Sequence, residues 1–214
     1  MIFPDFSYEE ELWKKNFTVL GIDEVGRGAF AGPVGIGGVV FPPNFSDLEK
    51  QKLLSLGIND SKKLSKKKRE YLSEIIKEKC LAYNTSFVDV ETIDAVGVGK
   101  ATFIGMQQVA ETINYKLRTK NLYLLIDAFE IPGSVYHQKG IVRGDSLSIS
   151  IAAASIIAKV ERDMLMDKLG VSYPDYGFDR HKGYGTVAHR KAISCLGVSS
   201  IHRTEFCKKT ISSL

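Results

Sequence analysis

The stretch at residues 17–33 limits what this chain can fold into more than any other part of the sequence. The apolar run at residues 17–22 is typical of a strand buried on both faces, and it ends in the adjacent acids Asp23 and Glu24. Such a pair is also common as a solvated turn or a helix cap. Two carboxylates a few ångströms apart repel by about 4 kcal/mol at an effective dielectric of 20, so a buried pair needs a cation or a proton.

The triplet Gly26, Arg27 and Gly28 lies directly beside these acids. Glycine leaves its backbone amide open to close approach by a ligand, and the forked guanidinium of arginine suits a phosphate. The spacing is not the GxGxxG fingerprint of dinucleotide-binding proteins. Acids, bare amides and an arginine in one short segment instead suggest metal-assisted chemistry on a phosphate ester.

Length and composition bound the class of protein. With 214 residues, 44% hydrophobic and 25% charged, the chain is long enough for one globular domain with a core of its own. A net charge of +4 permits an acidic partner without requiring one. No apolar stretch is long enough to span a membrane, and the N-terminus does not resemble a secretion signal. We expect a monomeric protein that is neither exported nor inserted in a membrane.

Cysteine usage favours a reducing compartment. Cys80, Cys195 and Cys207 are odd in number and widely spaced, with no C-x-x-C pair. This pattern indicates neither a disulfide framework nor a zinc knuckle. A cytoplasmic location fits best.

Hydrophobic periodicity predicts alternating strands and helices. Residues 17–22 and 34–41 are two predicted strands joined by the glycine-rich turn, which predicts a hairpin. Such alternation is typical of an α/β fold. The other expected elements are an amphipathic lead-in at 1–15, a helix capped by Ser65 and running to about residue 79, a strand at 81–88, a helical turn at 89–94, a helix at 100–117, a strand at 122–126, a packed helical stripe at 149–160 and a helix at 187–196.

Two further acids occupy informative places. Asp127 ends the apolar strand at 122–126, and open α/β sheets bind ligands beyond the carboxyl ends of their strands. Asp145 precedes the packed helical stripe, where it is a third site acid, a helix cap or an acid of the adjacent turn. Asp163 lies about 27 Å farther along an unbroken helix, so it is expected to pair with a lysine or arginine instead.

The residue types narrow the chemistry. Carboxylate oxygens favour Mg²⁺ or Mn²⁺ over Zn²⁺, and the four histidines lack the H-E-x-x-H spacing of zinc hydrolases. The chain has no G-x-x-x-x-G-K-[ST] and no G-x-S-x-G. Of the reaction classes considered, this leaves the hydrolysis of a phosphodiester with two metal ions. One ion activates water and the other stabilises the leaving oxygen.

A basic run could supply contacts to nucleic acid. Lysines and one arginine crowd residues 62–69, a pattern shared by solvated helix faces and by patches that bind a nucleic-acid backbone in a salt-dependent way. Ser61 precedes this run, and Lys182 and Arg203 could serve similarly. Tyr184 lies between two glycines, which give it little packing neighbourhood.

Taken together, the motifs resemble those of type 2 ribonuclease H, ribonuclease HII. The Gly-Arg-Gly triplet favours type 2 over its type 3 relative. The matching blocks cover nearly the whole chain in the family's order: DEVGRG at 23–28, AGPV at 31–34, NDSK at 59–62, IDA at 126–128, GD at 144–145, IAAASIIAK at 151–159 and HKGYGT at 181–186.

The resemblance implies both a fold and an activity. The fold would be ribonuclease-H-like, a mixed central sheet flanked by helices, forming a single domain over residues 1–214 with a small helical C-terminal part from about residue 186. The activity would be endonucleolytic cleavage of the RNA strand in RNA–DNA hybrids, and nicking on the 5′ side of a single ribonucleotide embedded in duplex DNA. The products would carry 3′-hydroxyl and 5′-phosphate ends.

The resemblance also implies roles for residues. Asp23, Glu24, Asp127 and Asp145 would be the catalytic carboxylates that bind two Mg²⁺ or Mn²⁺ ions. The backbone amides of the Gly-Arg-Gly triplet would read the ribose 2′-hydroxyl, which distinguishes RNA from DNA. Tyr184 would lie against the junction between ribonucleotide and deoxyribonucleotide. The complete expected substrate-binding set is Gly26, Arg27, Gly28, Ser61, Lys62, Arg143, Lys182, Tyr184 and Arg203.

Some positions depart from the family pattern. Leu147 stands where a lysine or arginine is usual, so a phosphate contact is missing or has moved to Arg143, and Leu147→Lys should tighten substrate binding. Val187, Val198 and Ser200 are further departures that bear on affinity more than on catalysis. Two alternatives stay open: a non-catalytic module that binds RNA–DNA hybrids, and a metal-dependent DNA nuclease or strand-transfer enzyme, which would have no need for the Gly-Arg-Gly triplet.

Overall fold

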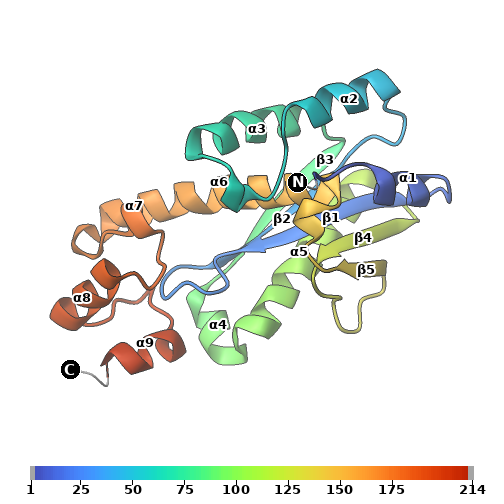
Figure 1. Ribbon diagram of the computed structural model, residues 1–214. Helices are drawn as coiled ribbons and strands as arrows, with labels where there is room; N and C mark the ends of the chain where they lie inside the picture. The colour runs from blue at the N-terminus through green and yellow to red at the C-terminus, as the bar shows by residue number, and fades with distance from the viewer. Residues whose placement is uncertain (1–2, 212–214) are drawn as a thin grey trace.

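A five-stranded mixed sheet forms the centre of the computed structural model, which describes residues 3–211 and gives side chains as far as Lys208 (Figure 1). The strand order is β3-β2-β1-β4-β5. β1 pairs with β2, and β2 with β3, in antiparallel fashion, whereas β1–β4 and β4–β5 are parallel. The strands are β1 Thr18–Val25, β2 Val34–Val40, β3 Ala82–Val88, β4 Leu122–Asp127 and β5 His137–Ile141.

Helices cover both faces of this sheet, which confirms the predicted ribonuclease-H-like α/β fold. The long helix α5, Val98–Leu117, packs its Met106 and Val109 against the isoleucines and leucines on one face. On the other face lies α6, Ile149–Ser172, and α3, Lys66–Lys79, packs on α6. The apolar spacing of α5 buries one stripe toward the sheet, whereas residues 149–158 of α6 are all buried because this helix lies between the sheet and α3.

The remaining elements are short and include a group at one end of α6, where α7, α8 and α9 gather (Figure 1). None of the helices within residues 3–211 is long and apolar enough to cross a membrane. The short elements outside the sheet and the three long helices are α1 Ser7–Trp13, α2 Asp47–Ser55, η1 Ser61–Lys63, α4 Val90–Val96, η2 Gly144–Ser146, η3 Pro174–Tyr176, α7 Phe178–His181, α8 Val187–Leu196 and α9 Thr204–Ile211.

Two glycines let α6 lie directly on the sheet. A Cβ added at Gly21 of β1 would lie 2.2 Å from the carbonyl carbon of Ser150, and one at Gly37 of β2 would lie 2.4 Å from the carbonyl oxygen of Ala154. Both distances are far below van der Waals contact. The small residues of α6 and these glycines thus bring the helix backbone against β1 and β2, beside the acids.

The first strand extends beyond its predicted end. We expected it to stop at Ile22, with both acids following it, but it continues to Val25. Asp23 and Glu24 pair with Gly37 and Ile36 of β2, because the antiparallel hairpin supplies backbone partners past the apolar run. The two acids therefore lie on a strand and not in a flexible turn.

Helices α2, α7 and α9 and strand β5 were not predicted from the sequence. Helix α2 begins with a capping box in which Ser46 and Glu49 exchange hydrogen bonds, a signal that was present but lies before a weakly periodic segment. β5 is a short edge strand with a polar sequence, so it carries no apolar alternation. The N-cap of α6 is Ser148, so the alternative in which Asp145 caps this helix is wrong.

Candidate active site

Asp23 and Asp127 lie at the same level on adjoining strands. Ile22 of β1 is the parallel partner of Ile126 of β4, so the next residue on each strand is an acid. The isoleucines belong to the core under α5, and strand side chains alternate between faces, so both acids face α6. Ser155 of α6 lies close enough to Asp23 to oppose the rise in the pKa of this carboxyl, which agrees with this placement.

Asp127 also fixes the turn that carries Asp145. The backbone N–H of Gly144 donates to Asp127 Oδ1 at 2.7 Å. A Cβ at Gly144 would meet Ile151 Cδ1 at 2.6 Å, so only glycine lets this turn approach so closely. Asp145 follows in η2 and is buried. Strand pairing and the Gly144 hydrogen bond therefore bring Asp23, Asp127 and Asp145 close together, although they are far apart in the sequence.

The N-terminal segment supports the same turn from outside. Glu9 of α1 is fully buried and its Oε1 accepts from the Ser148 hydroxyl at 2.5 Å and from Ser150 N–H at 2.9 Å. Asp5 adds backbone hydrogen bonds with Leu147 and Ile149. Together these bonds hold the junction between η2 and α6, just after Asp145.

Burial and the neighbouring carboxylates raise the pKa values of all four acids. Burial, followed by the charges of Glu24 and Asp127, raises the pKa of Asp23 well above its ordinary value. Burial raises the pKa of Glu24 although Arg27 opposes the rise, and burial also raises the pKa of Asp127 against the Gly144 N–H bond. For Asp145, burial and then the charges of Asp60 and Asp127 raise the pKa. Four partly or fully buried carboxylates that repel each other favour binding of a cation.

The donor set fits a hard divalent ion. Oε2 of Glu24 is buried without a hydrogen-bond partner, so it is free to act as a ligand. All the expected donors are carboxylate oxygens, which Mg²⁺ and Mn²⁺ prefer. Within residues 3–211 no three His, Cys, Asp or Glu side chains are already gathered as ligands of one ion. The two-ion site therefore stays a prediction.

A loop ending in η1 brings Lys62 to the acids. Asp60 Oδ1 accepts the N–H of Lys62 at 2.9 Å, which shapes the loop. Desolvation disfavours the charge of Lys62, but Asp23, Asp60, Asp145 and Asp127 outweigh it and raise the pKa of Lys62. Its ammonium is thus attracted toward the acid cluster while the side chain stays exposed. Asp60 belongs to the NDSK block at residues 59–62 but was not among the predicted site residues, which in this block are Ser61 and Lys62.

Ser61 has a structural role in this loop. It is buried, and its hydroxyl shares a 2.9 Å hydrogen bond with the hydroxyl of Ser155. The Ser61 hydroxyl thus ties the loop to α6, and a substrate contact of Ser61 stays a prediction. Ser155 also lowers the pKa of Asp23, so the residue that anchors the loop on α6 lies beside the first acid.

Only part of the Gly-Arg-Gly triplet, Arg27 and Gly28, is accessible to a ligand from solvent. Gly26 is buried with φ +79°, and a Cβ there would lie 2.1 Å from Arg162 Nε. Gly28 is exposed, with no heavy atom within 4 Å of a Cβ. Arg27 is half-buried, with its Nη1 3.9 Å from Glu24 Oε1 and its guanidinium 4.8 Å from the centre of the Phe129 ring. Gly28 and Arg27 are thus the members that a ligand could approach.

Tyr184 lies next to this loop. It forms an antiparallel bridge with Ala29, and its half-buried ring lies 5.8 Å from Lys159 Nζ and 5.6 Å from the Arg162 guanidinium carbon. The structure therefore brings together the triplet and the tyrosine, which are separated by more than 150 residues in the sequence. Arg162 contacts both and was missed, because it occupies a core-facing helix position with no local motif.

Two expected cationic contacts are already engaged within the protein. Arg203 is fully buried, and its guanidinium donates to backbone carbonyl oxygens. Lys182 Nζ pairs with Asp167 and donates to the Asp179 carbonyl. The expectation that Arg203 touches nucleic acid is corrected, because burial leaves no surface for it, and Lys182 has little donor capacity left. Arg143 is exposed beside η2 and stays available.

The structure accounts for Leu147, the main departure from the family pattern. Its half-buried side chain packs against a cluster that includes Leu12, Leu125 and Ile151. This position joins α1, β4 and the start of α6. An apolar residue here strengthens the packing under the turn that carries Asp145.

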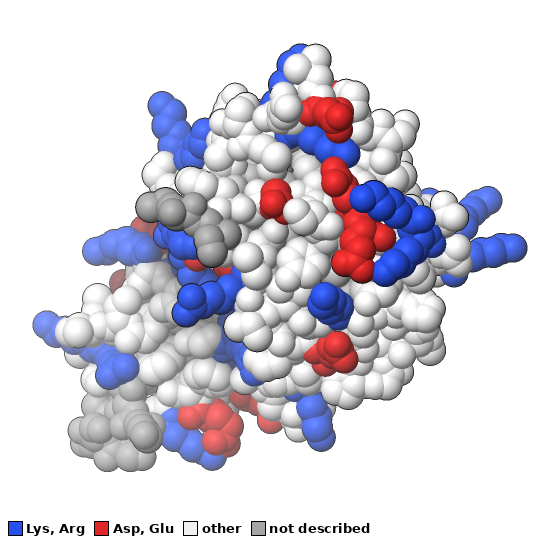
Figure 2. Space-filling model, turned by 45° about the vertical axis from the view of Figure 1, so that its right-hand side comes forward, with Lys and Arg blue, Asp and Glu red and all other residues white. Residues whose placement is uncertain are grey.

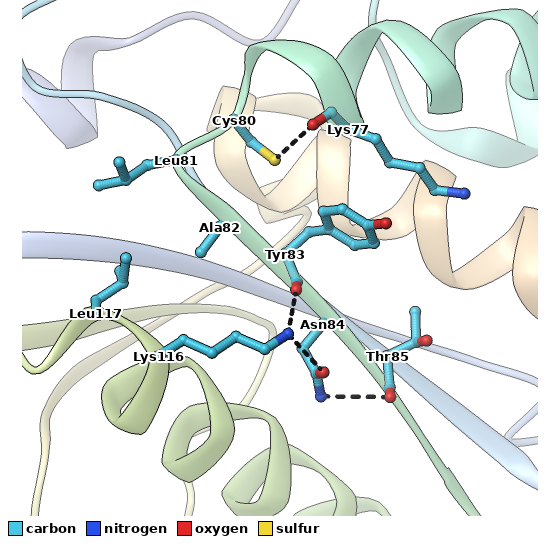
Figure 3. Close-up of a pocket in the computed structure, with 9 residues that line it drawn as sticks. All are labelled: Lys77, Cys80, Leu81, Ala82, Tyr83, Asn84, Thr85, Lys116 and Leu117. Carbon is cyan, nitrogen blue, oxygen red and sulfur yellow. Dashed lines mark hydrogen bonds between the residues drawn. The ribbon is translucent and has the colours of Figure 1, made fainter.

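A pocket at the edge strand β3 lies apart from these residues (Figure 3). Lys116 of α5 reaches it and donates to the Tyr83 carbonyl at 3.2 Å, which covers part of the strand edge. On the face drawn in Figure 2, acidic and basic groups adjoin each other. None of the predicted site residues is among those lining the pocket: Lys77, Cys80, Leu81, Ala82, Tyr83, Asn84, Thr85, Lys116 and Leu117.

Comparison with known sequences gives one consistent family. The sequence model described as Ribonuclease HII matches residues 20–209. A protein named Ribonuclease HII from Clostridioides difficile is 45% identical over 205 residues, covering 95% of this chain and 76% of that protein. Another of that name from Dehalococcoides mccartyi is 42% identical over 206 residues, covering 96% of this chain and 93% of that protein.

Solved structures agree in fold. RNase HII in its complex with PCNA from Archaeoglobus fulgidus aligns with a TM-score of 0.67 at 27% identity, covering 91% of this chain and 95% of that chain. Bst-RNase HIII in complex with Mn²⁺ aligns with a TM-score of 0.66 at 17% identity, covering 92% of this chain and 70% of that chain. The second likeness is one of fold alone.

Proposed function

The chain belongs to the ribonuclease HII family and is an endoribonuclease of RNA–DNA hybrids, and from this premise we propose that it also nicks duplex DNA on the 5′ side of a single embedded ribonucleotide. The proposed products carry 3′-hydroxyl and 5′-phosphate ends. Asp23, Glu24, Asp127 and Asp145 are the proposed catalytic acids. The proposed partners are thus the hybrid and ribonucleotide-containing DNA.

One observation carries the proposal for these acids. Asp23 and Asp127 occupy the same level of adjoining strands, and the Gly144 N–H bond to Asp127 joins them to the Asp145 turn. A phosphodiester at this place would face carboxylates from three separate segments. Glu24 adds a buried oxygen without a partner. No other cluster in the described part of the chain combines these features with an exposed glycine amide and an arginine.

We propose that these four carboxylates hold two Mg²⁺ or Mn²⁺ ions. When bound, such ions supply an activated water and stabilise the leaving oxygen of the phosphodiester. The support is the donor chemistry and the mutual repulsion of the acids, which a cation would relieve. The Mn²⁺ complex of the related Bst-RNase HIII agrees with this choice of ion.

The remaining proposed residues bind and orient the substrate. The exposed amide of Gly28 and the neighbouring Arg27 are placed to meet a ribose 2′-hydroxyl and its phosphate, and Tyr184 would lie against the following deoxyribose. Lys62 and Arg143 are exposed cations beside the acids, suited to backbone phosphates. A deoxyribonucleotide offers no 2′-hydroxyl to the glycine amides, so all-DNA duplexes would be poor substrates.

We propose that the protein acts as a monomer in the cytoplasm, within removal of ribonucleotides from DNA. The free cysteines Cys80, Cys195 and Cys207 suit a reducing compartment. Gel filtration with light scattering would test the oligomeric state directly.

The decisive experiment uses three duplexes of the same sequence: an RNA–DNA hybrid, DNA with one ribonucleotide, and all-DNA. With Mg²⁺ or Mn²⁺, we expect cleavage of the first two, a cut 5′ of the ribonucleotide, and no cleavage of the third. Asp127→Asn should abolish cleavage without unfolding the protein. Equal cutting of the all-DNA duplex would reject the ribose-reading proposal, and binding without turnover in both ions would support a non-catalytic module.

A further inference from the structure

Two arginines of the C-terminal half are fully buried behind the Gly-Arg-Gly loop. Arg162 of α6 and Arg203, just before α9, each have 0% exposed surface. In the part of the chain that the structure describes, neither guanidinium forms a salt bridge, and both donate to backbone carbonyl oxygens. A buried cation without a carboxylate is costly unless its donors are all used.

Arg162 connects the loop with the segment that carries Tyr184. Its Nε donates to the Pro33 carbonyl at 2.9 Å and its Nη2 to the Ala31 carbonyl at 3.2 Å, while Nη1 donates to the Lys182 carbonyl at 2.9 Å. The same guanidinium packs against Gly26, where a Cβ has no room. One side chain therefore sets the spacing between the end of the loop and residue 182.

Arg203 holds the loop from the other side. Nε and Nη2 donate to the Gly32 carbonyl at 2.9 and 2.8 Å, and Nη1 donates to the Arg27 carbonyl at 2.9 Å. The guanidinium thus spans from the centre of the Gly-Arg-Gly triplet to the far end of the loop. Only a planar fork with several donors can make both contacts at once.

Backbone hydrogen bonds complete this unit. Phe30 and Ala31 N–H groups donate to the Gly183 carbonyl at 2.8 and 3.2 Å. Gly32 N–H donates to Ile201 and Arg203 N–H to Phe30, each at 2.8 Å. The loop therefore lies between residues 183–184 and 201–203, held by two isolated antiparallel bridges, Ala29 with Tyr184 and Ala31 with His202. The C-terminal helical part is joined to the catalytic half at this point.

We propose that Arg162 and Arg203 are positioning residues that hold the Gly-Arg-Gly backbone and Tyr184 at a fixed spacing, so that discrimination between ribose and deoxyribose depends on two side chains that never reach the substrate. This inference rests on the proposed function of the triplet and Tyr184. It assigns to Arg203 a role opposite to the phosphate contact expected from the sequence.

The test compares Arg203→Lys and Arg203→Gln in an Asp127→Asn background, with binding to the ribonucleotide duplex and the all-DNA duplex measured over a salt series. We expect both variants to lose affinity for the ribonucleotide duplex by about 10- to 100-fold, since losing a buried hydrogen bond to the 2′-hydroxyl weakens binding to that degree. Lysine keeps the charge but cannot span Gly32 and Arg27. Affinity for all-DNA and the slope of log affinity against log salt should not change.

A direct phosphate contact would give a different result. Its removal in Arg203→Gln would reduce the salt slope by about 0.9 and weaken both duplexes alike, and Arg203→Lys would restore both properties. That outcome would overturn the proposal. The matched control is Arg143→Asn, at an exposed residue with φ 57° that asparagine tolerates, for which we expect the reduced slope and unchanged discrimination.

A measurement on the unmodified protein covers the case in which the variants do not fold. Amide hydrogen exchange should show the N–H groups of Phe30, Ala31 and Gly32 protected to the same degree as the centre of α6. Rapid exchange of these amides in the folded protein would overturn the proposal. If the wild type fails to prefer ribonucleotide DNA, the proposed function fails; if it discriminates and Arg203→Lys does so equally well, only the positioning role fails.

Discussion

The Nε2 atoms of His189 and His202 lie 3.0 Å apart in the interior of the C-terminal part. The Ser199 N–H donates to His202 Nδ1 at 2.9 Å, so His202 carries its proton on Nε2 and donates it to His189. His189 must then carry its proton on Nδ1, from which it donates to the Tyr184 carbonyl at 3.0 Å. Two neutral histidines thus continue the support of Tyr184.

This pair makes the free energy of unfolding depend on pH. Burial, aided by neighbouring histidine charges, lowers the pKa of His189 and of His202 to about 4. Unfolded histidine titrates near 6.5, so the stabilisation is complete above that pH and is lost as the pH falls toward 4, by up to about 3 kcal/mol for each group.

The measurement is urea unfolding of the parent and of His202→Gln between pH 8 and pH 4.5. At high pH the variant should be less stable because its hydrogen bonds are lost. The difference should shrink steadily below pH 6.5, since only the parent suffers protonation of His202. A difference that stays constant over the whole range would contradict the neutral pair.

Gly26 and Gly28 should respond oppositely to alanine. Gly26→Ala places a Cβ at positive φ against Arg162, so we expect a loss of at least about 2 kcal/mol of stability together with loss of cleavage. Gly28→Ala meets no protein atom, so stability should stay within about 0.5 kcal/mol of the parent. Its expected defect is weaker binding of ribonucleotide DNA, because the methyl group blocks the amide. Thermal unfolding and binding assays separate the two, and a Gly28→Ala variant with normal affinity would remove Gly28 from the substrate contacts.

Divalent ions should stabilise the protein through Asp23. Mg²⁺ at about 100 times its dissociation constant would add about 2.7 kcal/mol to the parent. Asp23→Asn removes a buried charge repelled by Glu24, so it should unfold at an equal or higher temperature than the parent in EDTA and gain little from Mg²⁺. The control is Asp163→Asn, which leaves Lys159 and Arg69 without their acid and lowers stability but should keep the Mg²⁺ effect. A full Mg²⁺ effect in Asp23→Asn would exclude Asp23 as a ligand.

Leu147→Lys should have two separable effects. A new cation beside the Asp145 turn should tighten binding of the substrate and steepen its salt slope by about 0.9. The lost packing against Leu12, Leu125 and Ile151 should cost about 1 kcal/mol of stability. Leu147→Met keeps the apolar packing and should change neither the slope nor, by more than about 0.5 kcal/mol, the stability. No change in affinity or slope in Leu147→Lys would indicate that Arg143 or another residue already makes this phosphate contact.

The periodic elements and the acids were predictable from local sequence. The apolar spacing of the sequence predicts helices α3 and α5 and strand β4. Ser65 caps α3 as expected, because its hydroxyl accepts the Lys68 N–H at 3.3 Å. α2 and β5 lack such spacing because they bury little surface. The predicted partner of Asp163 is confirmed, since it pairs with Lys159 at 2.7 Å.

The sequence by itself determined the α/β class, the two acid-bearing strands and the glycine triplet, since each depends on the order of residues within one segment. Only the tertiary structure decided which cations are free. Arg203 and Arg143 are the same kind of residue, yet one is buried on the carbonyls of Gly32 and Arg27 and the other is exposed. Burial and hydrogen-bond partners come from segments far apart in the chain, so no local pattern could separate an arginine that supports the loop from one that can meet a phosphate.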